Sequence, residues 1–510
     1  MATIDYVIII VYLAGTLALG VWLGRRIRTG KDYFLAGRTL PWWAIGLSLV
    51  VSDIGAKDIV GLAQEAYTHG WVMANWDWLG CIPAMILAAL VFVPYFWAGG
   101  FYTVPEYFGR RYNEGVQLIA TLVWGFFIAG NVGGIFAAST AVLTPMLGIA
   151  RNLEWAVLVV SAVFVGVYTY RGGLAAVVYT DVIQCILMIA GMGLVLYFAF
   201  EHPAVGSWDA LRERVTATHP DHFKMFHPPE NPSSFTTFSV VFGLGVVMGP
   251  AYWIGNQVIV QRVLGARSIG DARGGVLFGA LVKSIFPILL VLPGILAIAI
   301  LPGEILEGET KEIFPRLVRD LLPAGVRGIV LAAMVAGLMG NLDSYLNSAS
   351  TLWTRDVLRK YFFRDPALKG ETDASARLDL RLGRVLTVLL LICGVVVAPY
   401  ITRIFEFMQL MLSLFQGPFL ALLLFGMFWR RASAWGGLAG IVIGLSAALT
   451  LTLTGPRLFG YPNPYLHVAW WSFVVSCASV FLVSLLTRPH EAARLEGLVF
   501  GSRRENVPPR

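Results

Sequence analysis

Three charged side chains stand close together in a stretch of sequence that is otherwise apolar. Asp53, Lys57 and Asp58 belong to the run 42–65, and Gly55 between them loosens the backbone. If this run crosses a bilayer, each charge without a partner costs at least ~2.5 kcal/mol near mid-depth. Charges kept at that cost bind an ion or a polar solute, or pair with one another inside a helix bundle. The run therefore predicts a buried polar site.

Further polar residues are scattered through other apolar runs. A single one is readily explained as a structural ion pair, but a set drawn from both halves of the chain favours a shared polar cavity. Tyr252, Trp253 and Trp76 offer flat rings that could stack on a sugar, although aromatic residues of membrane proteins more often serve packing or interfacial anchoring. The polar residues are Asp77, Asp181, Lys283, Asn341, Asp343 and Gln409.

The composition indicates that lipid is the solvent for much of the surface. Of the 510 residues, 57% are hydrophobic and 14% are charged, and the mean hydropathy is +0.71. Soluble domains average about 25% charged residues. The net charge of +7 does not indicate nucleic acid, because the basic residues occupy short loops and not one amphipathic face. We therefore expect an all-α integral membrane protein with the lipid bilayer, not nucleic acid, as its partner.

About thirteen apolar runs are long enough to cross a bilayer, which takes about 20 residues each. Most of the 38 lysines and arginines fall in alternate segments, one of which contains Arg262, Arg267 and Arg273. The positive-inside rule then places the N-terminus outside and the C-terminus in the cytoplasm. The predicted spans are 3–23, 42–65, 75–98, 116–146, 154–171, 177–200, 236–258, 274–301, 324–347, 385–402, 404–428, 434–454 and 467–487.

Two predicted spans contain helix-breaking residues. One contains Gly55, and the other, the run 236–258, contains Gly249, Pro250 and Gly255. Irregular backbone at membrane depth is tolerated where it lines a wet cavity or is packed in protein. With the first span set aside, the broken spans head two groups of five with opposite topologies, as in transporters built from inverted repeats. We expect a leading helix at 1–30, repeats at 40–200 and 236–428, and two trailing helices with a cytoplasmic tail at 429–510.

Several short motifs stand out along the chain. Tyr33–Arg38 reads YFLAGR, Thr103–Tyr107 reads TVPEY and Gly172–Asp181 reads GGLAAVVYTD. Asn256–Arg262 reads NQVIVQR and Asn347–Thr351 reads NSAST. Together they resemble the sodium:solute symporter family, and NQVIVQR is similar to its sodium/glucose cotransporter branch. The resemblance implies a LeuT-like fold of two inverted five-helix repeats and solute transport by alternating access, usually coupled to sodium.

The resemblance also implies a sugar-binding site, which carries over with three departures. An asparagine of the family becomes Asp53, a histidine or glutamine becomes Asp58, and a glutamate becomes the shorter Asp77. The site keeps its hydrogen-bonding character and gains acid, so that a sugar or polyol fits and a cationic or amino-bearing solute is open as well. The positions that match the family are Tyr252, Trp253, Lys283 and Gln409.

The sodium site implied by the resemblance departs further. Its backbone carbonyls match Val51, Ile54 and Gly337, but its two hydroxyl positions hold Gly340 and Asn341. Both hydroxyls are therefore absent, although a hard cation favours several oxygen ligands.

Two interpretations of the ion site stay open. Asp343, one turn further along, and Asp181, which matches a family aspartate near the site, can supply the missing oxygen to sodium. Alternatively, the Lys57 ammonium lies near one of these carboxylates and stands in for the ion, and coupling is then to protons or absent. Apart from a coupling Na⁺, no cofactor is expected.

Other classes of function lack their sequence signals. The chain has no Gly-x-x-x-x-Gly-Lys-Ser/Thr loop for ATP and no HExxH or GxSxG motif of a hydrolase. A transporter-like sensor would bring a soluble output domain, for which the tail after residue 487 is too short. We therefore expect a secondary transporter, not an enzyme, in a plasma or bacterial inner membrane, with its oligomeric state open. Solvated histidines are expected in the outer loops, at His69, His219, His222 and His227.

Overall fold

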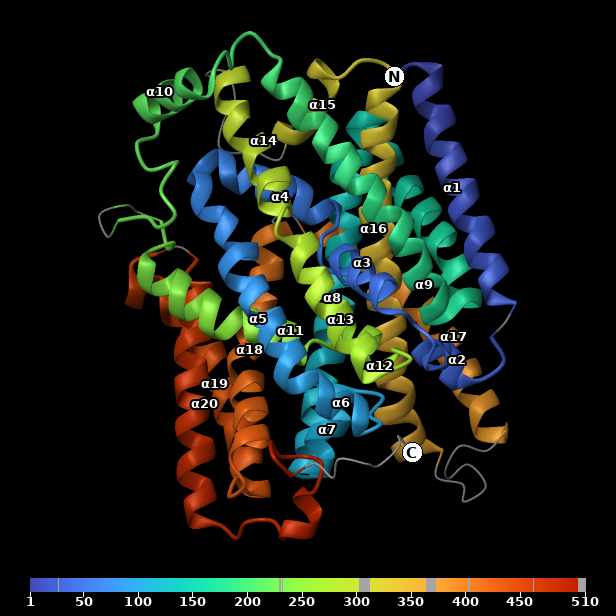
Figure 1. Ribbon diagram of the computed structural model, residues 1–510, viewed down its shortest axis with the longest axis vertical. Helices are drawn as coiled ribbons and strands as arrows, with labels where there is room; N and C mark the ends of the chain where they lie inside the picture. Colours follow the sequence, from blue (N-terminus) through green and yellow to red (C-terminus); the bar gives the residue numbers. More distant parts are fainter. Residues whose placement is uncertain are drawn as a thin grey trace.

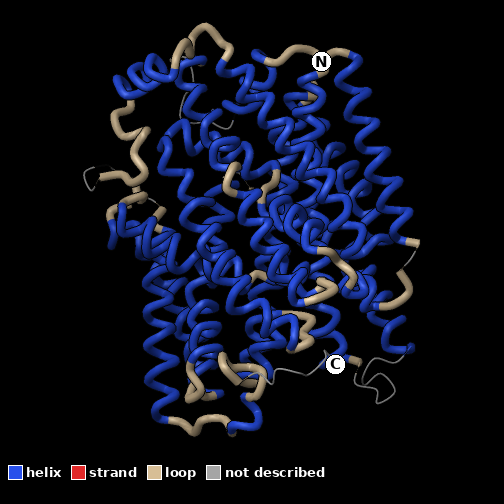
Figure 2. The backbone as a smooth tube through the Cα atoms, viewed as in Figure 1, coloured by secondary structure: helices blue, strands red, loops and turns tan. Residues whose placement is uncertain are grey.

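The computed structural model describes residues 1–25, 27–228, 231, 233–301, 312–363, 373–401, 404–461 and 463–502. In this part of the chain the regular structure is helical (Figure 2), apart from two isolated β-bridges. The predicted all-α class is confirmed. Arg26 and the segments 364–372 and 503–510, which carry part of the predicted cytoplasmic charge, lie outside the described residues.

The helices follow one another through mostly short connections (Figure 1). They are α1 Thr3–Gly24, α2 Gly30–Leu35, α3 Trp42–Asp53, α4 Ala56–His69, α5 Ile82–Leu87, α6 Val93–Ala98, α7 Val104–Arg111, α8 Glu114–Met146, α9 Glu154–Phe200, α10 Trp208–Thr218, α11 Gly249–Gly255, α12 Gln257–Leu264, α13 Ile269–Lys283, α14 Phe286–Ile300, α15 Ile313–Leu321, α16 Val326–Leu352, α17 Asp373–Val397, α18 Ile404–Phe428, α19 Ala434–Phe459 and α20 Tyr465–Leu486, with π-helical segments η3 Trp76–Cys81, η4 Ala88–Phe92, η6 Ser239–Met248 and η8 Trp353–Phe362.

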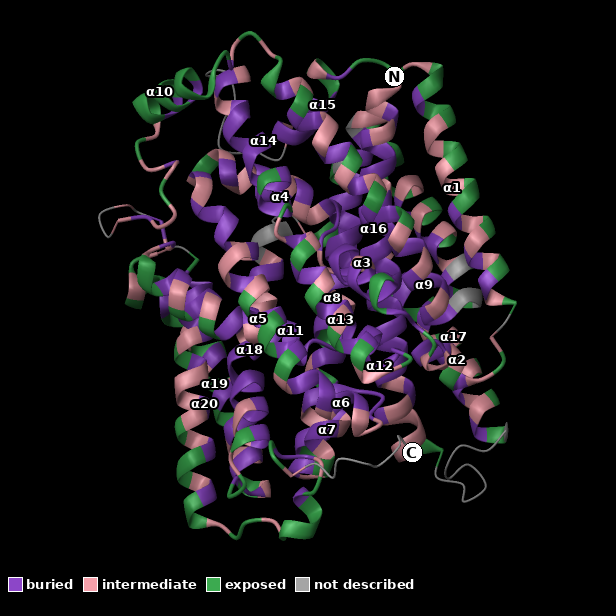
Figure 3. Cartoon of the chain, in the orientation of Figure 1, coloured by how far each residue is buried: buried purple, intermediate pink, exposed green. Residues whose placement is uncertain are grey.

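Ten helical stretches in the described part of the chain are long and apolar enough to cross a bilayer, or eleven if one bent pair counts as a span. Two further apolar helices, Trp42–Asp53 and Glu154–Val167, are shorter. Outer helices such as α1, α19 and α20 expose many apolar side chains (Figure 3), which suits contact with lipid tails. The predicted total of thirteen spans stays a prediction.

The first predicted break lies between α3 and α4. Ile54 and Gly55 leave the helix with φ/ψ of −93°/115° and −129°/−172°. A Cβ atom at Gly55 would lie 2.7 Å from the Asn341 Nδ2 atom, so the glycine allows α16 to approach the break. The Gly55 N–H donates to the Asp58 carboxylate at 2.8 Å, which caps the start of α4.

The second predicted break lies between α11 and α12, after the proline and not at it. Pro250 stands where the π-helical segment η6 passes directly into α11, and the backbone stays helical through it. The chain leaves the helix at Asn256, with φ −74° and ψ 120°, and the two parts are bent by 46°. The Asn256 side chain accepts a hydrogen bond from the Val258 N–H at 2.9 Å and so caps α12.

A third interruption divides α9. Gly173 has φ 51° and ψ −161°, a conformation that favours glycine, and a Cβ atom there would lie 2.7 Å from the Tyr33 carbonyl oxygen. The sequence predicts separate spans at 154–171 and 177–200, on either side of this residue.

Helix α16 forms the centre of the molecule. Nearly every residue from Val330 to Leu352 is buried, and the helix packs against α1, α3, α8, α9 and α17. Figure 3 shows the buried residues concentrated around it. Polar side chains on α16 therefore face other helices, and a polar atom left without a partner there is exceptional.

The outer segment after α10 is attached to the end of α4 by histidines. The Nε2 atoms of His222 and His227 lie 2.9 and 2.8 Å from the carbonyl oxygens of Tyr67 and His69. Both histidines are buried, which corrects the expectation of solvated loop side chains. The last carbonyls of a helix have no helical partner, and these imidazoles satisfy two of them.

Acidification is expected to loosen this attachment. Burial and neighbouring imidazoles lower the pKa of His69 and of His222 to about 4 from 6.5, and the pKa of His227 is lowered by burial. A histidine whose pKa is lower in the folded state than in the unfolded state contributes to the free energy of unfolding. The contribution is complete when the pH is above the unfolded-state pKa, and it is lost as the pH falls through the folded-state pKa. Amide exchange in 219–227, corrected for its intrinsic pH dependence, should therefore accelerate between pH 6.5 and 4.

Two carboxylates face the same cluster and favour protonated imidazoles: Asp221, and Glu65 at 3.6 Å from the His69 Nε2 atom. His219 and Lys224 have the opposite effect, because their positive charge disfavours a second one nearby. A variant with His222→Gln and His227→Gln keeps hydrogen-bond donors and leaves His69 as the remaining buried imidazole with a pKa lowered to about 4, so the acceleration should become much smaller. Equal acceleration in the variant and the wild type would contradict the explanation.

A methyl group at Gly249 is expected to destabilise the fold. It would overlap the carbonyl oxygen of Gly80, so that backbone meets backbone and no side chain can move aside. We expect Gly249→Ala to reduce the free energy of unfolding by ~1–3 kcal/mol, the usual cost of overpacking a core. The melting temperature of the purified protein should fall accordingly. Gly193→Ala is the matched control, because a Cβ atom there meets nothing within 4 Å. Equal melting temperatures for the two variants would count against a tight contact.

Candidate functional site

A polar cavity lies inside the molecule at the level of the α3/α4 break. It is enclosed by the break together with η3, η6, α11, α13 and α18. The structure brings together around it all seven side chains that the sequence analysis assigned to the solute, which are Asp53, Asp58, Asp77, Tyr252, Trp253, Lys283 and Gln409.

Lys283 holds two of the cavity's carboxylates. The side chain is almost fully buried, and its ammonium contacts the Asp53 carboxylate and lies 2.7 Å from Asp77 Oδ1. The three residues come from α13, the end of α3 and the start of η3. One cation between two anions leaves this corner of the cavity with a net negative charge, if all three groups are ionised.

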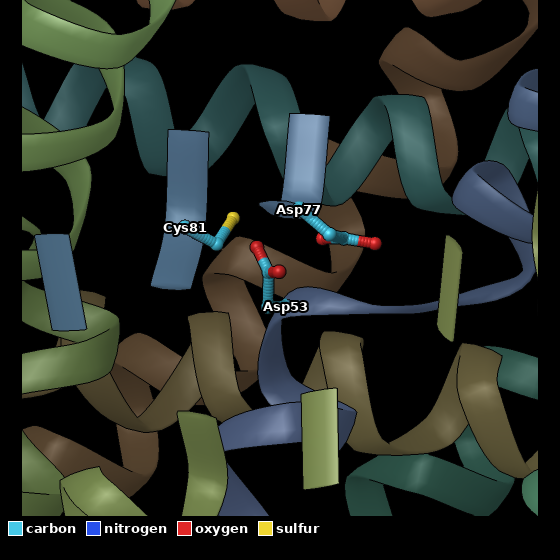
Figure 4. A group of neighbouring side chains, drawn as sticks. All are labelled: Asp53, Asp77 and Cys81. Atoms are coloured by element: carbon cyan, nitrogen blue, oxygen red, sulfur yellow. The ribbon is translucent and has the colours of Figure 1, made fainter. Parts of the chain in front are cut away.

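Asp53, Asp77 and Cys81 lie close enough to hold a metal ion, with ligand atoms within 4.8 Å of one another. Figure 4 shows their side chains converging from two segments. The Lys283 ammonium already supplies the positive charge for two of them, and a metal would have to displace it. The cluster is therefore better described as an ion-pair network than as a metal centre.

Lys57 also lines the cavity, beside Asp58. Its ammonium lies 3.5 Å from Asp58 Oδ1, and both side chains are mostly buried. Each of the cavity's two lysines thus has at least one carboxylate partner.

The lining also contains aromatic rings and amide side chains. Tyr252 and Trp253 meet edge to face at 5.8 Å, and the Lys283 ammonium lies 5.8 Å from the centre of the Trp253 ring. Several buried polar atoms of the lining have no hydrogen-bond partner in the part of the chain that the structure describes, and a bound solute or water must satisfy them. They are Trp253 Nε1, Asn131 Oδ1, Gln409 Oε1 and Gln416 Oε1.

The sequence analysis missed three polar residues of this lining, Asn131, Tyr345 and Gln416. A signal was available for one of them. Gln416 follows Gln409 by seven residues, about two helical turns, and therefore shares its face of α18. Asn131 is a lone amide in a long apolar run, which by itself does not indicate a cavity.

Part of the expected ion-coupling set meets at the α3/α4 break. The Asn341 Nδ2 atom donates to the Val51 carbonyl at 2.9 Å. Gly337 packs against the break, since a Cβ atom there would lie 3.2 Å from the Gly55 Cα atom. Ile54 lies in the break itself and lines the cavity.

Asp181 on α9 and Asp343 on α16 are both buried, and neither belongs to the cavity lining. The Ser344 hydroxyl donates to Asp343 Oδ1 at 3.2 Å, and the Ser48 hydroxyl donates to Asp181 Oδ2 at 2.6 Å. Gly340 lies against Asp181, as a Cβ atom there would be 3.0 Å from Asp181 Oδ1.

Arg262 corrects two expectations. The sequence analysis placed it in a basic cytoplasmic segment, but it is fully buried in α12. Its guanidinium lies 3.4 Å from Asp181 Oδ2, donates to Ser48 at 2.7 Å and contacts the Ser344 hydroxyl. Among the described residues, Arg262 is the salt-bridge partner of Asp181, and Lys57 is not. Charge counting from sequence could not reveal this, because a cation at the end of an apolar run reads as a loop residue.

Comparison with known proteins identifies the family of this chain. The model of the sodium:solute symporter family matches residues 33–444. The chain belongs to this family. The predicted family is therefore confirmed, and the chain is a membrane-embedded solute transporter and not an enzyme.

Similar members of the sodium:solute symporter family are sugar and polyol cotransporters by name. A sodium/glucose cotransporter of Vibrio parahaemolyticus is 32% identical, over 93% of this chain and 90% of that protein. A sodium/myo-inositol cotransporter of Oryctolagus cuniculus is 30% identical, over 99% and 80%. A sodium/mannose cotransporter of Bos taurus is 30% identical, over 100% and 91%.

A solved structure shows the same fold. It is a Na⁺-coupled sialic acid symporter in a substrate-bound, outward-open state, with a TM-score of 0.82, 22% identity, and coverage of 96% of this chain and 99% of that one. The LeuT-like fold class expected for a sodium:solute symporter is thus confirmed. The ends of the two repeats remain as the sequence predicts them.

Removing the Lys283 ammonium is expected to destabilise the protein strongly. Lys283→Met leaves Asp53 and Asp77 buried without their cation, a change that typically costs about 3–5 kcal/mol. Thermal unfolding of the purified variant measures the loss. The matched variant adds Asp53→Asn and Asp77→Asn, which removes the buried charges and should recover most of the stability. A triple variant no more stable than Lys283→Met would show that lost charge pairing is not the cause.

Proposed function

We propose that the protein is a symporter that moves a sugar or a related polyhydroxylated solute together with Na⁺ by alternating access. The observation that carries the proposal is the set of partnerless polar atoms in the cavity: three amide oxygens and one indole N–H beside carboxylates and aromatic rings. A solute with many hydroxyl groups donates and accepts in several directions at once and satisfies such a set. The names of the similar cotransporters support the same class of solute.

Within this proposal, each wall of the cavity has a task. Tyr252 and Trp253 stack on the apolar face of the solute, and Gln409 accepts from its hydroxyls. Asp53, Asp58 and Asp77 bind hydroxyl pairs, and Lys283 holds two of these carboxylates in place. The acid in the cavity favours a second candidate, an amino-bearing solute, because the carboxylates outnumber the two lysines of the lining.

The proposed cycle uses the predicted architecture. The repeats 40–200 and 236–428 rock against each other, with the leading helix before them and the two trailing helices after them. The broken pairs α3/α4 and α11/α12 are the corresponding elements of the two repeats. The N-terminus lies outside and the C-terminal tail lies in the cytoplasm, in a plasma or bacterial inner membrane, as the distribution of basic residues favours.

Sodium is the proposed coupling ion, with the carbonyls of Val51 and Ile54 on one side of its site and the Gly337 carbonyl, with other residues of α16, on the other. Gly340 offers no side-chain oxygen, and Asn341 turns an N–H donor toward the Val51 carbonyl. Asp343 or Asp181 is then needed as an oxygen ligand. In the alternative, the Lys57 ammonium carries the positive charge and coupling is to protons or absent.

Uptake into liposomes separates these alternatives. We expect the wild type to take up one member of a panel of labelled sugars, polyols and amino sugars, and to do so faster with an inward Na⁺ gradient than with choline. Asp343→Asn should weaken the stimulation by Na⁺, whereas Lys57→Ala should leave it in place.

Uptake that ignores Na⁺, follows pH and loses its pH dependence in Lys57→Ala would overturn sodium coupling in favour of the ammonium. Preference for an amino sugar over its neutral counterpart would select the second solute class.

A further inference from the structure

Gly340 lies in a crowded position that no larger residue could share. A Cβ atom there would overlap the Val51 side chain and lie 2.5 Å from Gln184 Oε1 and 3.0 Å from Asp181 Oδ1. The Gln184 amide oxygen therefore occupies the space into which a side chain at 340 would grow. Where the family carries a hydroxyl on α16, this chain holds an amide oxygen from α9.

Three side-chain oxygens near Gly340 have no hydrogen-bond partner among the described residues. Asp181 and Gln184 are fully buried and Asn341 is 1% exposed, yet Asp181 Oδ1, Gln184 Oε1 and Asn341 Oδ1 are all unsatisfied. A buried polar atom without a hydrogen-bond partner is unfavourable, and native proteins keep few of them. Two such acceptors beside one glycine, and a third on the next residue, suit a positively charged ligand. The Gln184 Nε2 donor also has no partner among the described residues, but the amide turns its oxygen and not this N–H₂ group toward Gly340.

The surrounding contacts hold Asp181 in place. Its Oδ2 atom accepts from Ser48 at 2.6 Å and lies 3.4 Å from the Arg262 guanidinium, which leaves Oδ1 as the unpaired oxygen. Gln184 follows Asp181 by three residues on α9 and so shares its face of the helix. The two oxygens therefore reach Gly340 from the same side.

We infer that Gln184 and Asp181 supply the coupling cation with side-chain oxygens in place of the missing hydroxyls, and that the Asn341 amide turns to add its own. Rotation of the Asn341 amide exchanges Nδ2 and Oδ1, so that an oxygen and not an N–H faces the Val51 carbonyl. A hard cation can bridge two such oxygens, whereas the N–H bonds the carbonyl when no cation is bound. The inference rests on the proposed sodium coupling and names residues that coupling would use.

Stabilisation of the purified protein by Na⁺ tests this without measuring transport. The melting temperature of the wild type is expected to rise with NaCl, compared with choline chloride at equal ionic strength, because an ion that binds the folded state stabilises it. Gln184→Leu keeps the volume and removes the oxygen. It should raise the half-saturating Na⁺ concentration by about 10- to 100-fold, the usual loss for a supporting group of a metal site.

Asn347→Leu is the matched control. Asn347 carries another buried amide with no partner, on α16 about two turns beyond Gly340, and the inference gives it no part in cation binding. This variant should respond to Na⁺ as the wild type does.

A further variant tests whether the loss of the Na⁺ response in a Gln184 variant is caused by misfolding. Gln184→Ala together with Val51→Ala empties the space beside Gly340, since both side chains would meet a Cβ atom there, and Gly340→Ser added to the pair places a hydroxyl in that space. The triple variant should recover a large part of the Na⁺ response that Gln184→Ala with Val51→Ala loses.

An unchanged half-saturating concentration in both Gln184 variants would overturn the inference, since it would mean that water alone satisfies these oxygens. A wild type that binds a labelled sugar but shows no stabilisation by Na⁺ would remove sodium coupling and this inference together, and would leave the proposed solute class standing. The two failures are therefore distinguishable.

Discussion

A single buried ammonium joins three segments around the cavity. Lys283 on α13 contacts Asp53 at the end of α3 and lies 2.7 Å from Asp77 at the start of η3. Each of these charges is costly in a lipid-surrounded interior, and together they offset much of that cost. The arrangement fixes the direction of the broken helix, because α3 can end at Asp53 only where its carboxylate has a partner. The cavity follows from this constraint.

Backbone groups that are freed at the two helix breaks also need hydrogen-bond partners. Between α3 and α4 the chain leaves the helix, and the freed carbonyl of Val51 accepts from Asn341 on the central helix α16. Between α11 and α12 the Asn256 side chain caps the second helix. Both breaks are thus satisfied by amide side chains, which can donate and accept. At position 341 this chain has an amide side chain, whereas the family resemblance implies a hydroxyl-bearing residue.

Much of the architecture could be predicted from the sequence, because lipid imposes simple rules. Long apolar runs predict spans, and glycine with proline at membrane depth predicts breaks; the structure has both, with the second break displaced to Asn256. The residues assigned to the solute line one cavity, but their choice came from family motifs and not from spacing alone. Their roles remain predictions.

The contributions of Arg262, Gln184 and the outer histidines could not be predicted. A basic residue at the end of an apolar run has the same sequence pattern whether it faces water or a buried carboxylate. The burial of Arg262 depends on Asp181, 81 residues earlier, and on hydroxyls from two further helices. Likewise, His222 and His227 are buried because helix α4 happens to end beneath them.

The contact between Gly80 and Gly249 carries a consequence for how such a chain can diverge. Here η3 and α11 meet through backbone atoms, with a carbonyl oxygen where a side chain would otherwise lie. Substitution elsewhere in a core can be absorbed by neighbouring side chains, but a carbonyl cannot be exchanged by mutation. A lineage can enlarge the residue at position 249 only by moving an entire helix. The distance between the segments that carry Asp77 and Trp253 should therefore stay constant as the sequence diverges. The side chains around the cavity can still be replaced, and such replacements can change which solute binds.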